Sequence, residues 1–327
     1  MSNPEFKSVF KAEFQELIQL KRALGFKYEA QAMAFGRIDS FFVNNNIKEK
    51  EISRELCDKW CRKRSHESDS NHAHRVSRLR VFCRYLNDIG IPVHTPPPGI
   101  TNKRKKYDAH IYTKDELQRF FKAVDASKSI PSECPYRGLV MPIFFRILYT
   151  SGMRVSELRL LKIKNVNLDE GCVKVTGGKN QKDRIVPIHP SLVKKCIELR
   201  DTIHMTSSEE EFFFMIRPGQ AMPLVNVYHN FRRYLEKADI PHTGRGPRVH
   251  DFRFTYCVNL LLKWANEDKD LMTYLPYMRT ILGHEGFKET AYYLKLTAEA
   301  YPLVRTHLEQ AFPNVIEEAC FNEREFY

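Results

Sequence analysis

Side chains that could act on a phosphodiester recur in the second half of the chain. Arg154 precedes Glu157 by three positions, so the carboxylate can hold the guanidinium while other N–H donors stay directed at a phosphate. His250 and Arg253 lie one helical turn apart, which puts an imidazole and a guanidinium on one face. Either pair alone is commonly a helix-end contact, so neither identifies a site by itself.

A lysine, a second histidine and a tyrosine complete this set. Lys179 and Lys182 lie at the tip of a predicted hairpin over residues 173–187, where a lysine can reach into a groove and donate a proton. His284 follows a glycine that ends a helix, and Tyr293 stands nine residues later. Taken singly, these residues are most often solubilising, capping or packing groups.

Together, the order Arg, Lys, His with Arg, His and Tyr is what phosphoryl transfer without a metal ion would need. Here cations would replace the metal ion, because preorganised donors aimed at the transition state typically contribute several kcal/mol each. A tyrosine, with an ordinary pKa near 10, can attack once a neighbouring group removes its proton. Because covalent capture conserves the energy of the cleaved bond, we expect no cofactor and no ATP.

The elements that must position these residues are mainly helices. Thr113 followed by Glu116 forms a capping box, and residues 139–149 are apolar nearly all round, which predicts a buried helix. The periodicity then changes to short β-type runs that predict a small antiparallel sheet of about three strands, and helices resume at Leu192. The runs are 166–168, 173–175 and 185–188.

The first 90 residues predict only amphipathic helices and no strand. A helix over 72–86 has one apolar face and one cationic face, and such a face on a small helical domain can follow DNA phosphates. The candidate DNA-binding residues on it are Arg75, Arg78 and Arg84.

A stiff, basic segment separates the two halves. After Gly90 the chain is rich in proline and then carries four consecutive cations that are weaker candidates for DNA contact: Lys103, Arg104, Lys105 and Lys106. We therefore predict a helical DNA-binding domain over 1–95, a linker over 96–110 and a catalytic domain over 111–327, whose C-terminal helix and tail start near residue 298.

Bulk composition agrees with a nucleic-acid partner. Lys and Arg number 52 against 40 Asp and Glu, giving a net charge of +12 and a field that favours a polyanion. The scattered cysteines and the lack of a long apolar run predict a cytoplasmic protein with no membrane span. A zinc module around Cys57, Cys61, His66, His72 and His74 is the weaker alternative, because the spacing fits no strong zinc signature, and we predict no metal site.

Residues from about 110 to 295 resemble the catalytic domain of tyrosine recombinases, the family of phage integrases, Xer-type resolvases and transposon integrases. The family has a Gly-x-Arg-x-x-Glu-Leu box, a Gly-Lys hairpin running to Val-Pro, a His-x-x-Arg pair, a Leu-Gly-His box, and a Tyr nine residues after that His. Here these motifs fall on Gly152, Arg154, Glu157 and Leu158; on Gly178, Lys179, Val186 and Pro187; on His250 and Arg253; on 282–284; and on Tyr293.

The resemblance implies a role for each matching residue. Tyr293 would attack the scissile phosphate to give a 3'-phosphotyrosine and a free 5'-hydroxyl, which makes the protein a site-specific recombinase that is independent of metal and ATP. Arg154 and Arg253 would clamp the phosphate, and Lys179 would protonate the leaving oxygen. In the same way, His250 would act as acid and base, His284 would hydrogen-bond the phosphate, and Glu157 would position Arg154.

Three departures leave alternatives open. Phe254 follows Arg253 where the family often has another His, Lys182 is a second candidate for the general acid, and Tyr292 adjoins the proposed nucleophile. A sequence-specific DNA-binding protein without activity predicts binding but no covalent adduct. An enzyme like the type IB topoisomerases predicts relaxation of supercoils without a specific site.

The resemblance also implies assembly on double-stranded DNA. In this family the C-terminal segment packs onto a neighbouring subunit in a cyclic tetramer, so we expect residues from about 298 onward to dock in trans. The two-domain length favours a simple recombinase of a mobile element, or a resolvase.

Overall fold

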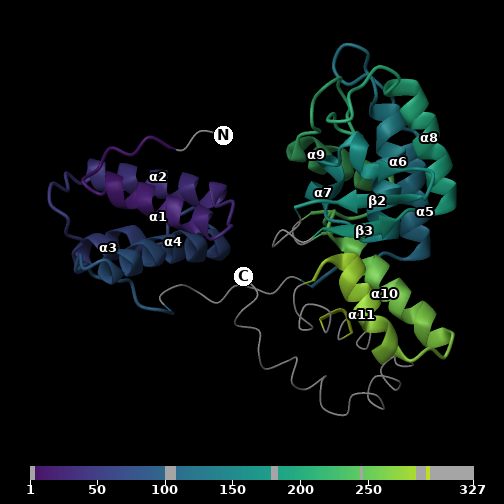
Figure 1. Cartoon of the computed structure of the whole chain (residues 1–327). Helices are drawn as coiled ribbons and strands as arrows, with labels where there is room; N and C mark the ends of the chain where they lie inside the picture. The colour runs from purple at the N-terminus through teal and green to yellow at the C-terminus, as the bar shows by residue number, and fades with distance from the viewer. Residues whose placement is uncertain (1–3, 100–107, 178–182, 244–245, 285–291, 295–327) are drawn as a thin grey trace. The chain divides into compact units, whose positions relative to one another are not determined.

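The computed structural model describes residues 4–99, 108–177, 183–243, 246–284 and 292–294 (Figure 1). The chain divides into two compact units, Met1–Lys106 and Tyr107–Tyr327, and each is described here by itself. The four cations at 103–106 and the tail from residue 298 lie outside the described residues.

The first unit contains four helices around a core rich in phenylalanine, and its described residues include no strand. Phe14 and Phe82 stack with ring centroids 3.8 Å apart, which ties the first helix to the fourth. The all-helical prediction for this half is confirmed. The helices are α1 (Lys11–Ala23), α2 (Glu29–Asn44), α3 (Arg54–Cys61) and α4 (Asp69–Asp88).

One arginine of the cationic face of α4 is engaged within the protein. Arg75 bonds the Glu67 carboxylate through Nε and Nη2, both at 2.7 Å, and also bonds the carbonyl oxygens of Trp60 and Arg62. Its side chain is only 12% exposed, and these contacts link α3 to α4, so any contact of Arg75 with DNA stays a prediction. Arg84 is exposed and Arg78 is half-buried, and both stay candidates.

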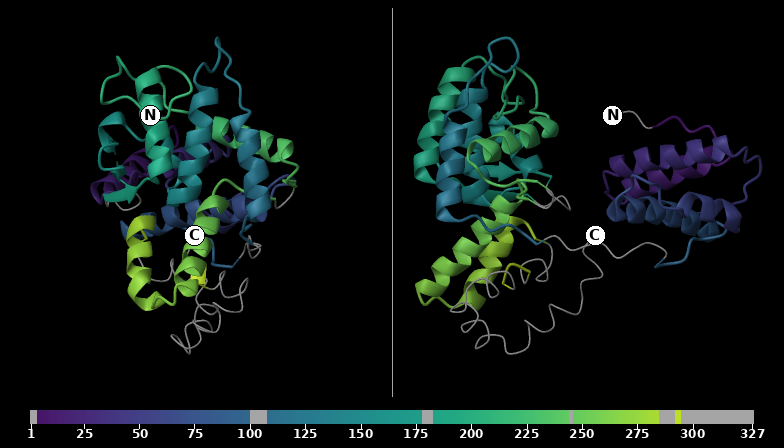
Figure 2. Two further views of the ribbon diagram at one scale, coloured as in Figure 1. Left: turned by 90° about the vertical axis from the view of Figure 1, so that its right-hand side faces the viewer. Right: turned by 180° about the vertical axis from the view of Figure 1, so that it is seen from behind.

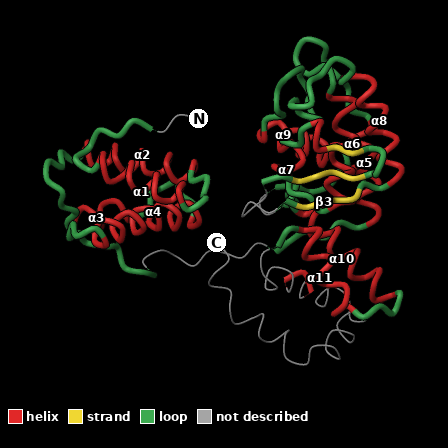
Figure 3. Tube along the Cα trace, viewed as in Figure 1, coloured by secondary structure: helices red, strands yellow, loops and turns green. Residues whose placement is uncertain are grey.

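The second unit is mostly helical with one small sheet (Figure 3). The predicted capping box is confirmed: Thr113 accepts from the Glu116 amide, and the Glu116 carboxylate accepts from the Thr113 amide. The predicted apolar helix is α6, but Leu139 on it is 45% exposed. The helices are α5 (Lys114–Asp125), α6 (Arg137–Ser151), α7 (Val155–Arg159), the short 3-10 helix η1 (Ile163–Asn165), α8 (Pro190–Ile203), α9 (Leu224–Lys237), α10 (Asp251–Asn266) and α11 (Leu271–Leu282).

The sheet is antiparallel, as predicted, and its strand order is β1-β2-β3. Its strands are β1 (Val166–Asn167), β2 (Cys172–Val175) and β3 (Arg184–Pro187). Val173 pairs with Val186, and Val175 pairs with Arg184, so the buried residues of β2 and β3 share one face. An arginine therefore occupies a position on the core side of β3.

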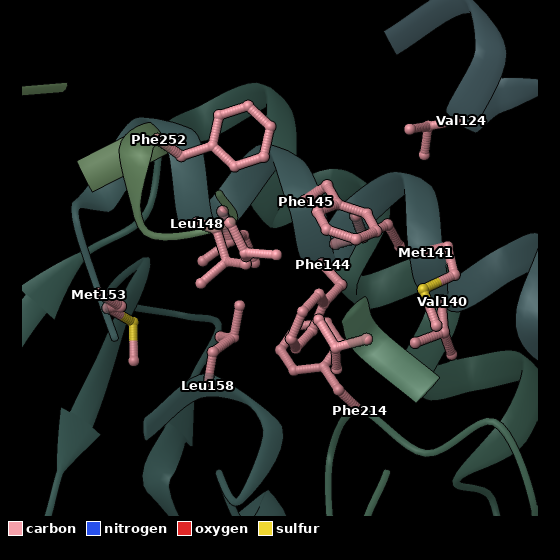
Figure 4. Packing of buried hydrophobic residues seen from close by; sticks show 14 of the residues in the cluster. Val124, Val140, Met141, Phe144, Phe145, Leu148, Met153, Leu158, Phe214 and Phe252 are labelled. Atoms are coloured by element: carbon pink, nitrogen blue, oxygen red, sulfur yellow. The ribbon is translucent and has the colours of Figure 1, made fainter. Parts of the chain in front are cut away.

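The core of the second unit reaches the segments that carry the candidate site residues. Met153 and Leu158 are buried on either side of Arg154 and Glu157, and Phe252 is buried beside Arg253, among the aromatic rings of α5 and α6 (Figure 4). The helices α10 and α11 lie side by side next to this core, as both views of Figure 2 show. No helix in the described part of the chain has both the length and the apolar character that crossing a membrane requires.

Candidate active site

Glu157 is the centre of the first cluster of charged groups. It lies in the first turn of α7, directly after the buried helix α6 has ended, and its carboxylate accepts the Arg154 amide and one guanidinium N–H of Arg154, both at 2.8 Å. Because this carboxylate caps the helix and binds the guanidinium at once, the side chain of Arg154 is held beside its own turn. The predicted pairing of the two residues is confirmed.

Arg184 is a second partner of Glu157 that the sequence analysis missed. Its Nη1 and Nη2 donate to the two carboxylate oxygens at 3.1 and 2.7 Å, and its Nε donates to the Ile281 carbonyl at 2.8 Å. Arg184 thereby joins β3, α7 and the end of α11. The available signal was the alternation of β3, since Arg184 is in step with Val186 and Ile188, and a cation on that face requires a carboxylate.

These contacts strongly lower the pKa of Glu157. Burial alone would raise it, but the hydrogen bonds and charge of Arg184, followed by those of Arg154, outweigh burial and bring the pKa from 4.5 to about 2. A carboxyl group whose pKa is lowered by folding stabilises the folded state at pH values above its pKa in the unfolded chain. This contribution is lost as the pH falls from about 4.5 towards 2.

Substitution Glu157→Gln should therefore destabilise the second unit by about 3 kcal/mol at neutral pH, because it leaves a buried guanidinium without its counter-charge. The chain has two tryptophans, Trp60 and Trp264, so in a Trp60→Phe background urea unfolding followed by fluorescence reports the second unit. The difference between the Glu157→Gln variant and its parent should shrink as the pH falls from about 4.5 towards 2. A constant difference over that range would contradict the assignment, and Glu210→Gln, at an exposed ion pair, is the control with little effect.

Arg253 is the centre of the second cluster. The side chain is 2% exposed, and its Nη1 donates to the Gly152 carbonyl at 2.7 Å while Nη2 donates to the Leu282 carbonyl at 2.8 Å. These carbonyls belong to the ends of α6 and α11. Arg253 therefore ties three helices together through backbone groups that the helices leave unpaired.

Two glycines make these helix ends possible. Gly152 ends α6 with a φ of 63°, and a Cβ there would lie 2.7 Å from the ring of Tyr256. Gly283 follows α11 with a φ of 64°, and a Cβ there would lie 3.0 Å from the guanidinium of Arg184. Both positions need the left-handed conformation and the absence of a side chain, which explains the glycine in each motif.

The second cluster also contains His284 and Tyr293. Arg253 Nη2 lies 2.9 Å from His284 Nε2, and Arg253 Nε donates to the Tyr293 hydroxyl at 3.4 Å. Since a guanidinium can only donate, His284 accepts through Nε2 in this contact. The rings of His284 and Tyr293 stack with centroids 5.5 Å apart and planes 9° apart. The structure thus brings together the predicted His, Arg and Tyr.

Tyr293 is withdrawn from solvent. It is 4% exposed, and burial raises its pKa to about 12 despite the opposing charges of Arg253 and Arg154. Cys257 of α10 is a neighbour that the sequence analysis did not identify; burial also raises the pKa of its thiol to about 12, and the Tyr293 hydroxyl partly offsets that shift. At neutral pH the Tyr293 hydroxyl is therefore protonated in this state.

His250 is the residue immediately before α10. Although His250 as a whole residue is exposed, the surrounding protein desolvates its imidazole, and Arg253 and Arg154 add repulsion between like charges. These effects lower its pKa to about 4. His250 is consequently neutral at physiological pH and can accept a proton.

We expect a titration of the free protein by NMR to show this directly. The resonance of His250, assigned by its loss in His250→Gln, should titrate with a midpoint near pH 4, well below the 6.5 of an unperturbed histidine. A midpoint for His250 at or above 6.5 would show that its imidazole is neither desolvated nor faced by the two arginines.

Two predicted residues cannot be placed in this site. Lys179 and Lys182 lie outside the described residues, so their roles stay predictions. Within the described ranges, no group of three or more His, Cys, Asp or Glu side chains could hold a metal ion. In the region of the alternative zinc module, His72 instead bonds the Cys61 carbonyl through Nε2 at 2.6 Å, and Cys57 is buried.

Comparison with known families decides the class of this protein. The family model described as "Phage integrase family" matches residues 111–300, which is more than half of the chain. The chain belongs to the phage integrase family. This integrase is accordingly a tyrosine site-specific recombinase, an enzyme that binds DNA and recombines it, as the sequence predicted.

Individual relatives agree with this assignment. A putative integrase/recombinase of Sinorhizobium fredii, y4rB, is 28% identical to this integrase over 314 residues, covering 93% of this chain and 98% of that protein. Tyrosine recombinase XerA of Thermococcus kodakarensis is 29% identical over 227 residues, covering 68% and 70% of the two chains.

Solved structures share the fold. The Tn1549 transposon integrase in complex with circular intermediate DNA matches with a TM-score of 0.62 and 16% identity over 92% of this chain and 98% of that one. A lambda integrase dimer bound to a core site matches with a TM-score of 0.60 and 13% identity over 86% and 94%. The predicted fold, mostly helical with a small antiparallel sheet in the C-terminal part, is confirmed.

Proposed function

We propose that the Tyr293 hydroxyl oxygen attacks the phosphorus of the target phosphodiester in duplex DNA. The bond from phosphorus to the 5'-oxygen breaks, the 3'-phosphate becomes linked to Tyr293, and the 5'-oxygen takes a proton and leaves as a hydroxyl. Because one phosphate ester is exchanged for another, a 5'-hydroxyl can reverse the step and rejoin a strand without ATP.

The contact of Arg253 with both Tyr293 and His284 is the observation that carries this proposal. The distances are 3.4 Å from Arg253 Nε to the Tyr293 hydroxyl and 2.9 Å from Nη2 to His284 Nε2. A nucleophile beside a fixed cation and a histidine is the arrangement that stabilises charge developing on a phosphate. The three residues come from distant motifs, so their meeting is not a consequence of local sequence.

The two arginines differ in how many donors they still offer to a phosphate. Of the five N–H groups of a guanidinium, Arg253 directs one at Gly152, two at Leu282 and His284, and one at Tyr293, which leaves one. Arg154 directs one at Glu157 and is 23% exposed. We infer that the phosphate is bound first by Arg154, in an orientation set by Glu157.

Entry of the phosphate then changes the surroundings of Tyr293. With a pKa near 12 the hydroxyl is a poor nucleophile, but a phosphate oxygen competing for Arg253 Nε would release it towards the phosphorus. His250, which is neutral at physiological pH, is the proposed proton acceptor. Following the family resemblance, Lys179 is the proposed donor to the 5'-oxygen and His284 hydrogen-bonds the phosphate.

Trapping of the covalent intermediate tests the proposal. The full chain is incubated with DNA that carries its target site and a nick beside the scissile phosphate, so that the released fragment diffuses away. Denaturing electrophoresis with 5'-labelled DNA should then show a protein–DNA adduct that proteinase removes. An adduct retaining the 5' label is attached through the 3'-phosphate, which is the expected polarity.

The two alternatives predict other outcomes in the same assay. A DNA-binding protein without activity would bind the site in native gels and give no adduct. An enzyme of the topoisomerase type would relax supercoiled plasmid that lacks the site. The recombinase is expected to give an adduct only on its site.

We further propose that the integrase works on DNA as a homo-oligomer, a tetramer in the synaptic complex, in the cytoplasm, and that it belongs to a mobile element. The support is the lambda integrase, solved as a dimer bound to a core site, and the Tn1549 transposon integrase, solved with circular intermediate DNA. Arg78 and Arg84 of α4, with the cations at 103–106, are proposed to contact phosphates of the same duplex. Light scattering that finds one chain per paired DNA complex would reject the tetramer.

A further inference from the structure

A basic pocket of about 320 Å³ lies in the second unit, apart from the site described above. It is formed by the segment before α6, the segment before α9 and one face of α9. Three guanidinium groups line it, together with His229 and the side-chain amides of Asn226 and Asn230; the three are Arg137, Arg217 and Arg233. Glu133 is the single carboxylate in its lining.

The three arginines keep N–H donors available because few groups of the protein accept hydrogen bonds from them. Arg137 donates only to the Lys128 carbonyl, from Nε at 2.8 Å and from Nη2 at 2.5 Å, and Arg217 donates to the Glu133 carbonyl through Nε. These backbone contacts fix two guanidinium groups without neutralising them. Among the described residues, none of the three arginines takes part in an ion pair, and Arg233 makes no hydrogen bond.

A second hollow of about 260 Å³ adjoins the first. Arg137 and Arg233 line both hollows, and the second adds Lys128 and Lys237 and contains no carboxylate among its lining residues. Two adjacent basic hollows that share their arginines suit two neighbouring anions on one chain better than a single small anion. A nucleic-acid backbone presents such a series of phosphates.

We propose that these two hollows bind backbone phosphates of the DNA duplex, at positions other than the phosphate that is cleaved. This proposal rests on DNA being the substrate of the proposed reaction. Arg159 of α7 donates to the Met222 carbonyl just before α9 at 3.1 Å, so α9 starts beside the helix that carries Arg154 at its N-cap. A helix of this length spans about 21 Å, so the hollows lie within reach of a duplex bound at the active site.

The salt dependence of DNA binding tests the proposal without requiring the target site. Fluorescence anisotropy with a labelled duplex of arbitrary sequence measures the affinity of the full chain between about 50 and 200 mM salt. Each lost phosphate contact should lower the slope of log K against log salt by about 0.9. We expect Arg233→Gln to lower it by about one contact and Arg217→Gln with Arg233→Gln by about two.

Arg200→Gln is the matched control, because it removes the same charge from α8, which lies on the opposite edge of the second unit from α9 in Figure 1. Its slope should equal that of the wild type, and thermal melting by circular dichroism verifies that every variant is folded. Slopes for both pocket variants equal to that of Arg200→Gln would overturn the proposal. Failure of the proposed reaction would be distinguishable from failure of this proposal. It would appear as a missing covalent adduct, while the slopes of the pocket variants would still differ from that of Arg200→Gln.

Discussion

Tyr293→Phe should abolish the covalent protein–DNA adduct, lowering the rate of strand cleavage by about 10⁴-fold or more, because only the hydroxyl oxygen can bond to phosphorus. The ring should keep its place, since it stacks on His284 and packs on Phe254 with centroids 5.3 Å apart. Binding to DNA should therefore change little. Adduct formation on nicked DNA and native-gel affinity, measured side by side, check both parts.

Tyr292→Phe is the matched control, because it removes the same atom from the adjacent residue. Tyr292 is half-buried and its ring also packs on Phe254, with centroids 5.8 Å apart, so both substitutions disturb similar surroundings. This variant should form the adduct at a rate close to that of the wild type. If the adduct survives in Tyr293→Phe and disappears in Tyr292→Phe, the assignment of the nucleophile is wrong.

Arg253→Lys should lower both the cleavage rate and the stability of the second unit. The ammonium group retains the charge but cannot reproduce the planar fork that reaches Gly152, Leu282 and His284 together. Loss of a preorganised donor to the transition state costs about 10²- to 10³-fold in rate. Each buried carbonyl left without a donor costs about 1–3 kcal/mol.

Single-turnover adduct formation and thermal melting measure the two effects. Arg146→Lys is the control, since Arg146 pairs with Asp125 at the surface, and the variant should stay within about 1 kcal/mol of the wild type and keep its rate. Wild-type rate and stability in Arg253→Lys would mean that the fork is not needed. Loss of stability alone would assign Arg253 to the fold and not to the phosphate.

Arg253 contributes both to the packing of the helices and to the proposed active site, so a substitution there should affect both. The same guanidinium satisfies the carbonyl ends of α6 and α11 and contacts the proposed nucleophile. Phe252, the residue before it, is fully buried in the aromatic core, which fixes the start of α10. A group held in this way needs no reorganisation when charge develops on the substrate.

Local order was readable from the sequence because it depends on neighbours in the chain. The capping box at Thr113 and Glu116, the apolar helix α6 that ends at Gly152, and the alternation of β2 and β3 are all set within a few residues. The motif residues were likewise found by their spacing. Arg75 shows the limit of this reasoning, because its place on a cationic helix face did not reveal its pairing with Glu67 and two carbonyls.

The sequence alone thus determined the residue types, the two-part helical organisation and the recombinase family. Only the tertiary structure decided which groups meet: Arg184 reaches Glu157 across 27 residues, and Arg253 reaches Gly152 across 101 and Tyr293 across 40. Burial in the tertiary structure likewise raised the pKa of Tyr293 to about 12 and, together with Arg253 and Arg154, lowered that of His250 to about 4. The physical reason is that burial and electrostatic partners arise from segments remote in the chain, and spacing along the sequence does not encode them.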